Sequence, residues 1–239
     1  LSAVPEAVTG AGSMLGQGFR TRASVLADRA HGRAVDEDEI ATTLATLMDG
    51  GKHLWVANLG LEVASLATGA AVHEVLWESG RHVPQPGLVA VAGTVARARL
   101  TGDAHALLGC AQDLEWARLY GLAMRVMADV TVLSEPHTRV GLQSRAELLR
   151  LLRLWDGAYP RWLPSLDTLP TQRQMQIAWR IVDGATAADV AAESFLSVRT
   201  VENHLHRVYQ RLHVHGREEL TAVLRPPPRP AQWRPGAAR

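Results

Sequence analysis

The stretch LSVRTVENHLHRVYQRLHVHGREEL, residues 196–220, decides the fold of the C-terminal part of this 239-residue chain. Apolar residues recur in it at spacings of three and four: Val201, Leu205, Val208 and Leu212. This spacing places all four side chains on one face of an α-helix. Ser197 stands just before them as a good N-cap, so the sequence predicts a helix over 198–212 with one buried face.

The opposite face of this predicted helix is polar. At about 100° per residue, the side chains farthest from the apolar row point away from the core. They are Arg199, Asn203, His206 and Gln210, with Glu202 and Arg207 on the flanks. A long helix divided in this way presents its polar side outward, where a partner can contact it.

Two shorter helices are predicted before it. Thr171 and Gln174 have the spacing of a capping box and begin a helix that Gly184 ends. Thr186 and Asp189 have the same spacing and begin a second, short helix. Two short helices that support a longer one with a polar outer face meet the requirements for reading the major groove of DNA.

The same residues carry a resemblance to a known family. Thr171, Gln174, Gly184, the Val190-Ala191 pair and the run 196–220 resemble the LuxR-type helix-turn-helix domain over residues 170–225. The matching framework is Ser197, Thr200, Val201, Asn203, His204, Leu212, Val214 and Arg217. Three residues depart from the family pattern: Gln174 stands where the family usually has Glu, Ser194 where it has Leu, and His213 where it has Gly. The likeness is closest to the C-terminal part of large regulators that have helical repeats before the DNA-binding domain.

The resemblance implies a transcriptional regulator whose recognition helix, 198–212, lies in the major groove of double-stranded DNA. The DNA-contacting residues expected are Arg199, Thr200, Glu202, Asn203, His206, Arg207, Gln210 and Arg211. Positions matching Glu202, Asn203 and His206 read base edges. The three arginines are expected at phosphates. In the family the final helix forms a homodimer contact, which this chain would make through Leu220, Val223 and Leu224.

Residues 1–156 are predicted to be an α-helical, repeat-like region. Apolar residues recur at helical spacing, and Gly50 and Gly80 are expected to end helices. The one strand-like run, 88–91, leads directly into a helical pattern, so we expect no sheet and an all-α chain. Abundant alanine favours paired helices of the tetratricopeptide kind. We expect this region to receive an unidentified protein or small-molecule effector, and core positions for its tryptophans, Trp55, Trp77, Trp116 and Trp155.

Proline marks the remaining boundaries. Residues 157–169 contain Pro160 and Pro164 and are predicted to be a linker, which leaves 170–225 as the DNA-binding domain. Residues 226–239 are rich in proline and poor in apolar residues, so we predict a disordered tail.

Composition limits the class of protein. The net charge is only +1, so DNA binding requires a local basic patch. Apolar runs are too short to span a membrane and the N-terminal residues do not resemble a secretory signal, so we expect a cytoplasmic protein. The single cysteine, Cys110, lies in an apolar helical pattern and is expected to be a buried, inert thiol.

An enzyme is not indicated. The sequence has no phosphate-binding GxxxxGK[ST] loop, no GxSxG and no HExxH, so we expect no catalytic residues and no cofactor. His204 and His206 point about 160° apart on one helix and do not share a metal ion. The alternative to a regulator is a helical interaction scaffold whose helix-turn-helix no longer binds DNA, which Glu202 on the reading face and the low net charge favour.

Overall fold

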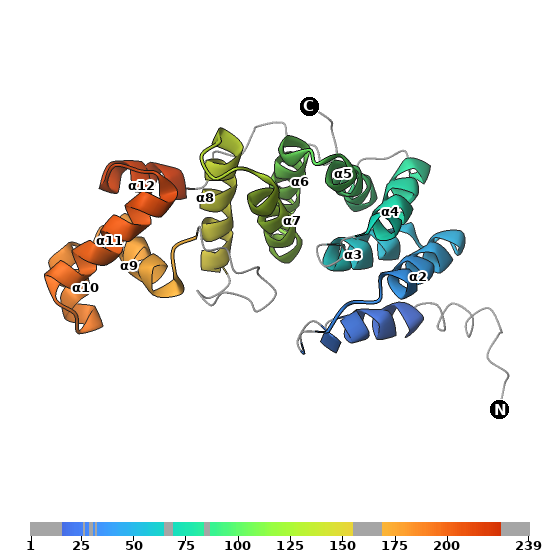
Figure 1. Cartoon of the computed structure of the whole chain (residues 1–239), viewed down its shortest axis with the longest axis horizontal. Coiled ribbons are helices and arrows are strands. Elements are labelled where there is room, and N and C mark those ends of the chain that lie inside the picture. The colour runs from blue at the N-terminus through green and yellow to red at the C-terminus, as the bar shows by residue number, and fades with distance from the viewer. Residues whose placement is uncertain are drawn as a thin grey trace. The chain divides into compact units, whose positions relative to one another are not determined.

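The computed structural model describes residues 16–25, 27–28, 31, 33–64, 69–83, 87–154 and 169–225. Throughout these residues the regular elements are helices and none is a strand, so the all-α prediction is confirmed (Figure 1). The chain divides into two compact units, Leu1–Val126 with Ala231–Arg239, and Met127–Pro230. Apart from Leu169, the linker predicted over 157–169 lies outside the described residues, as does the tail predicted over 226–239.

The first unit is a succession of short helices. After a helical segment at 16–25 they are α2 (Glu37–Asp49), α3 (His53–Val63), α4 (Ala70–His82), α5 (Leu88–Thr101), α6 (Ala104–Trp116) and the beginning of α7 (Tyr120–Leu133). Helix α3 packs on both α4 and α5, and α4 packs on both α2 and α5. Contacts with the next helix and the next but one are typical of stacked helical hairpins.

Local sequence explains several helix ends in this unit. The carboxylate of Asp36 accepts a hydrogen bond from the backbone N–H of Glu39 at 2.9 Å and caps the start of α2. Gly50 ends α2 as predicted. The strand-like run 88–91 forms the first turn of α5, because the helical pattern that follows it decides its conformation.

Gly80 does not end a helix, contrary to the sequence prediction, and lies inside α4. A Cβ atom on Gly80 would be 2.8 Å from the Cα of Gly93 in α5, closer than real Cβ contacts come. The two helix backbones therefore touch at these glycines. Gly80 serves close packing between α4 and α5, and single-sequence patterns do not distinguish that role from a helix end.

Only some of the residues predicted to lie in the core are buried in the structure. Cys110 is a buried free thiol, as predicted, and its burial raises its pKa to about 12. Trp77 and Trp116 are half-buried, whereas Trp55 is exposed, so the core prediction is wrong for Trp55; Trp155 lies outside the described residues. None of the described helices is long and apolar enough to cross a membrane.

The second unit contains the C-terminal helices. They are the end of α7, α8 (Arg139–Leu154), α9 (Gln172–Val182), α10 (Ala187–Ser194), α11 (Val198–Leu212) and α12 (Arg217–Leu224), coloured yellow-green to red in Figure 1. Helix α11 packs on α9 and α10, and α12 packs on α9 and on α8. The predicted apolar row of α11 is buried, at Val201, Leu205, Val208 and Leu212.

We predict opposite effects for two glycine-to-alanine substitutions. Gly80→Ala should lower the free energy of unfolding by about 1–3 kcal/mol, because its methyl group forces α4 and α5 apart. Gly109→Ala is the matched control: Gly109 lies in α6 with no heavy atom within 4 Å of the added Cβ. It should raise stability by about 0.5–1 kcal/mol through helix propensity. Urea unfolding of both variants checks this, and equal effects would contradict the close-packing account.

Candidate nucleic-acid interface

Helix α11 begins at a well-formed cap. The hydroxyl of Ser197 accepts a hydrogen bond from the backbone N–H of Thr200 at 3.1 Å, and the two side-chain oxygens are 2.8 Å apart. The four buried apolar residues of α11 fix its rotation about its own axis. The cap and the apolar row together determine which side chains face outward.

The two short helices that support α11 begin at the predicted capping boxes. Thr171 and Gln174 exchange side-chain-to-backbone hydrogen bonds at the start of α9, and Thr186 and Asp189 do so at the start of α10. An ion pair between Arg180 and Glu193 joins the two helices. Gly184, at φ 111°, adopts the left-handed conformation needed to turn the chain after α9.

Most of the predicted DNA-contacting residues gather on one exposed face of α11. The exposed side chains are Arg199, Glu202, Asn203, His206, Arg207 and Gln210. The amide nitrogen of Gln210 donates to Nε2 of His206 at 3.0 Å, so these two side chains are held together one turn apart. Thr200 is half-buried, and its hydroxyl is hydrogen bonded to the N-cap.

Arg211 is placed differently from the other arginines of α11. It is half-buried, and its Nη1 donates to the carbonyl oxygen of Leu169 at 2.7 Å and to Oε1 of Gln174 at 3.3 Å. That same amide oxygen accepts from the backbone N–H of Thr171. Arg211 therefore ties the end of α11 to the start of α9, a role that the helical pattern alone does not reveal.

The exposed face of α11 carries a local positive charge. The face carries two arginines and one glutamate, Arg199, Arg207 and Glu202, a balance of +1, because Arg211 is bonded within the domain. Both arginines are exposed on this helix. A basic patch of this kind suits an anionic partner such as the DNA backbone.

The three residues predicted for a dimer contact do not form one surface. Leu220 is 0% and Leu224 2% exposed, whereas Val223 is 38% exposed. The two leucines lie on the side of α12 that packs within the unit, against α9 and α8. Of these three residues, only Val223 is accessible to a second molecule.

Helix α8 contacts the helix-turn-helix at more than one place. Arg153 forms an ion pair with Asp183 at 2.6 Å, and its guanidinium carbon is 4.6 Å from the centroid of the Trp179 ring. Just before α8, the His137 ring meets the His213 ring edge-on at 4.6 Å. Sequence reasoning missed these contacts, because a proline-containing segment separates α8 from the domain.

The three departures from the family pattern have different consequences. Gln174 completes the capping box as a glutamate would. His213 ends α11 in the left-handed conformation, at φ 53°, where glycine would be unstrained. Ser194 is the last residue of α10 and is partly exposed, where a leucine would add apolar packing. The fold of α9 to α11 accommodates all three.

Short helices α9 and α10, which support α11 and its exposed polar face, define this part of the chain as a helix-turn-helix of the DNA-binding class. Residues 169–224 match the family described as bacterial regulatory proteins, luxR family. These residues form a LuxR-type DNA-binding domain, as the resemblance indicated. Neither the curated proteins nor the solved structures gave a match to the chain.

We predict that alanine substitutions at Arg207 and Arg211 differ in their effect on stability. Arg211→Ala should lower the free energy of unfolding by about 1.5–3 kcal/mol, because it removes charged hydrogen bonds to partly buried acceptors. Arg207→Ala, on the exposed face, should change it by less than about 0.5 kcal/mol. Thermal or urea unfolding of the full chain measures both. A loss from Arg207→Ala as large as that from Arg211→Ala would refute this division of roles.

Proposed function

We propose that this protein is a sequence-specific transcriptional regulator that inserts α11 into the major groove of double-stranded DNA. The observation that carries the proposal is the row of exposed polar side chains on α11 within a LuxR-type domain. The row faces away from the buried apolar residues, so the whole helix can approach DNA without repacking. The protein would act in the cytoplasm.

The side chains on the row have different tasks in this proposal. Asn203 can pair bidentately with adenine, and Glu202 can accept a hydrogen bond from cytosine. His206, held by Gln210, supplies a further contact to a base edge. Arg199 and Arg207 neutralise phosphates. Thr200 adds a hydroxyl next to the DNA backbone. Arg211 makes no DNA contact in this proposal and instead holds α11 in place within the domain.

The protein is further proposed to bind as a homodimer through α12. One helix-turn-helix covers a short half-site, and specificity usually comes from two half-sites about one turn of DNA apart. Val223 offers an exposed apolar side chain for the contact between the two copies. Leu220 and Leu224 are buried and hold α12 in place on the domain. Direct participation of the two leucines requires α12 to separate from the helices on which it packs, α8 and α9.

An interaction scaffold with a degenerate helix-turn-helix is the second candidate function. Glu202 is exposed on the face of α11 proposed to contact DNA. Its carboxylate repels phosphates unless a cytosine amino group donates a hydrogen bond to it. In this case the full chain would show no preference among DNA sequences at any salt concentration. The helical first unit would then be the main binding region.

We predict that Asn203 and Arg199 affect DNA binding in different ways. Asn203→Ala should weaken binding to the preferred site by about 1–3 kcal/mol and change binding to unrelated DNA little, because it removes a base contact. Arg199→Ala should weaken both and reduce the salt dependence by about one ion, because it removes a phosphate contact. Titrations at several salt concentrations measure both effects. Equal losses on both DNAs for Asn203→Ala would make it a positioning residue.

The dimer proposal predicts the behaviour of Val223→Glu. A charge on the exposed side of α12 should abolish tight binding to a full palindromic site and leave the weaker, nonspecific affinity and the helical circular dichroism unchanged. Ala222→Glu, at a neighbouring exposed position of α12, is the control for added charge alone. Tight binding of the palindrome by folded Val223→Glu would rule out this dimer.

A further inference from the structure

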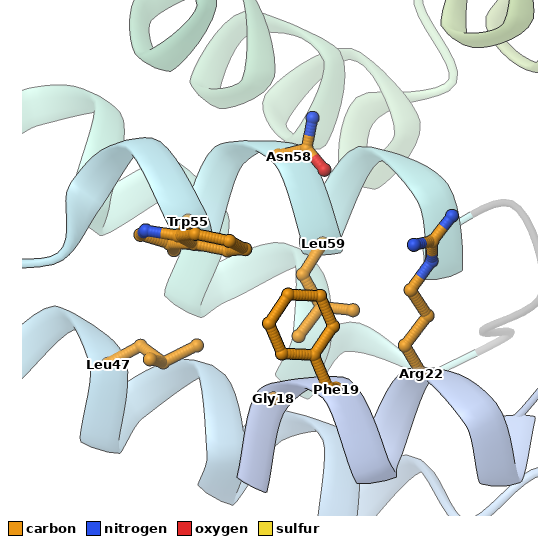
Figure 2. Close-up of a pocket in the computed structure, with 7 residues that line it drawn as sticks. All are labelled: Gly18, Phe19, Arg22, Leu47, Trp55, Asn58 and Leu59. Carbon is orange, nitrogen blue, oxygen red and sulfur yellow. The ribbon is translucent and has the colours of Figure 1, made fainter. Parts of the chain in front are cut away.

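Exposed apolar side chains occur in both units, and in the first unit contacts within the fold account for a pair of them. The rings of Phe19 and Trp55 meet edge to face with their centroids 5.4 Å apart, beside the buried side chains of Leu47 and Leu59 (Figure 2). Each ring is thereby packed against the other. Val198, in the second unit, is exposed in a different setting, on the helix proposed to contact DNA.

Val198 is the first residue of α11 and is 42% exposed. The other exposed residues of α11 are all polar: Arg199, Glu202, Asn203, His206, Arg207 and Gln210. Val198, Glu202 and His206 follow one another at intervals of four residues, so they lie on successive turns along one strip of the helix. Val198 therefore extends the proposed DNA-contacting row by one apolar side chain at its N-terminal end.

The start of α11 does not need an apolar side chain at this position. Ser197 caps the helix by accepting from the backbone N–H of Thr200, and four other residues form the buried row. Valine is a weaker helix former than alanine, and the positive end of the helix dipole favours an acidic residue in the first turn. The first turn of α11 has no acidic residue, so no charge in it repels phosphates. An exposed valine next to Arg199 suits contact with DNA better than it suits the stability of the helix.

Thymine offers an apolar group in the major groove. Its C5-methyl group is recognised by direct contact with side-chain carbon atoms. In a helix-turn-helix the residues at the N-terminus of the recognition helix reach the base edges. Four residues of an α-helix span about 6 Å, and successive bases on one strand are about 3.4 Å apart. Val198 therefore reaches a base about two base pairs from the one that Glu202 contacts.

We propose that Val198 determines part of the sequence specificity by contacting the C5-methyl group of a thymine, about two base pairs from the cytosine proposed for Glu202. The inference rests on the proposed function, since it requires α11 to lie in the major groove. It adds to that function a base that the hydrogen-bonding side chains of the row do not read. Each half-site of the preferred DNA then contains a thymine at this place.

Replacement of thymine by uracil tests the contact, because it removes the methyl group and leaves the hydrogen-bonding groups of the base in place. The preferred site is selected from random double-stranded DNA with the full chain. The chain is then titrated with this site and with copies in which each thymine in turn is uracil. At one thymine, about two base pairs from a cytosine, uracil should weaken binding about fourfold, the effect of one buried CH₂-sized group.

Three variants of the full chain assign the effect to Val198. Val198→Ala should bind the thymine and uracil copies with equal affinity, because the side chain that contacts the methyl group is gone. Val198→Ile keeps a branched apolar side chain and should retain the fourfold preference for thymine. Val132→Ala is the matched control: Val132 is 59% exposed in α7, outside the DNA-binding domain, and its loss should change neither affinity.

The outcomes separate this inference from the proposed function. If a preferred site is selected but uracil at each thymine leaves the affinity unchanged, the methyl contact is refuted and sequence-specific binding stands. Full retention of the thymine preference by folded Val198→Ala, with its helical circular dichroism unchanged, also refutes the role of Val198. If no sequence is preferred, the proposed function fails and this inference fails with it, and the exposed side chain of Val198 is then left for a protein partner.

Discussion

Burial of the apolar row of α11 is the interaction on which the C-terminal unit depends. Val201, Leu205 and Val208 face α9 and α10 in the core, so the rotation of α11 is fixed. The outward direction of Asn203 and Arg207 follows from that rotation and requires no further contact. Because the same helix both completes the core and presents the polar face, loss of its packing would remove the binding surface together with the fold.

Contacts distant in sequence then determine how this surface is supported. Arg211 bonds to Leu169 and Gln174 and so attaches the far end of α11 to the start of α9. Arg153 in α8 adds an ion pair with Asp183 at the end of α9. Helix α8 also packs on α12, the helix proposed to form the dimer.

The sequence was sufficient where short-range patterns decide the structure. The capping boxes at Thr171 and Thr186 and the helix over 198–212 were predicted from residue spacing, and the structure has them. It was insufficient where distant residues meet, because helical periodicity identifies a face and not its partner. Gly80 was therefore mistaken for a helix end, and the domain boundary predicted at 156/157 did not anticipate the contacts of α8.

The central claim is that the polar face of α11 reads a DNA sequence, and selection from a random pool of double-stranded DNA tests it most directly. The full chain should enrich one sequence over successive rounds at physiological salt, and its specific affinity should exceed the nonspecific affinity by roughly a thousandfold or more. If a folded chain binds every sequence in the pool equally, or binds none, sequence reading is contradicted and the interaction-scaffold function is favoured.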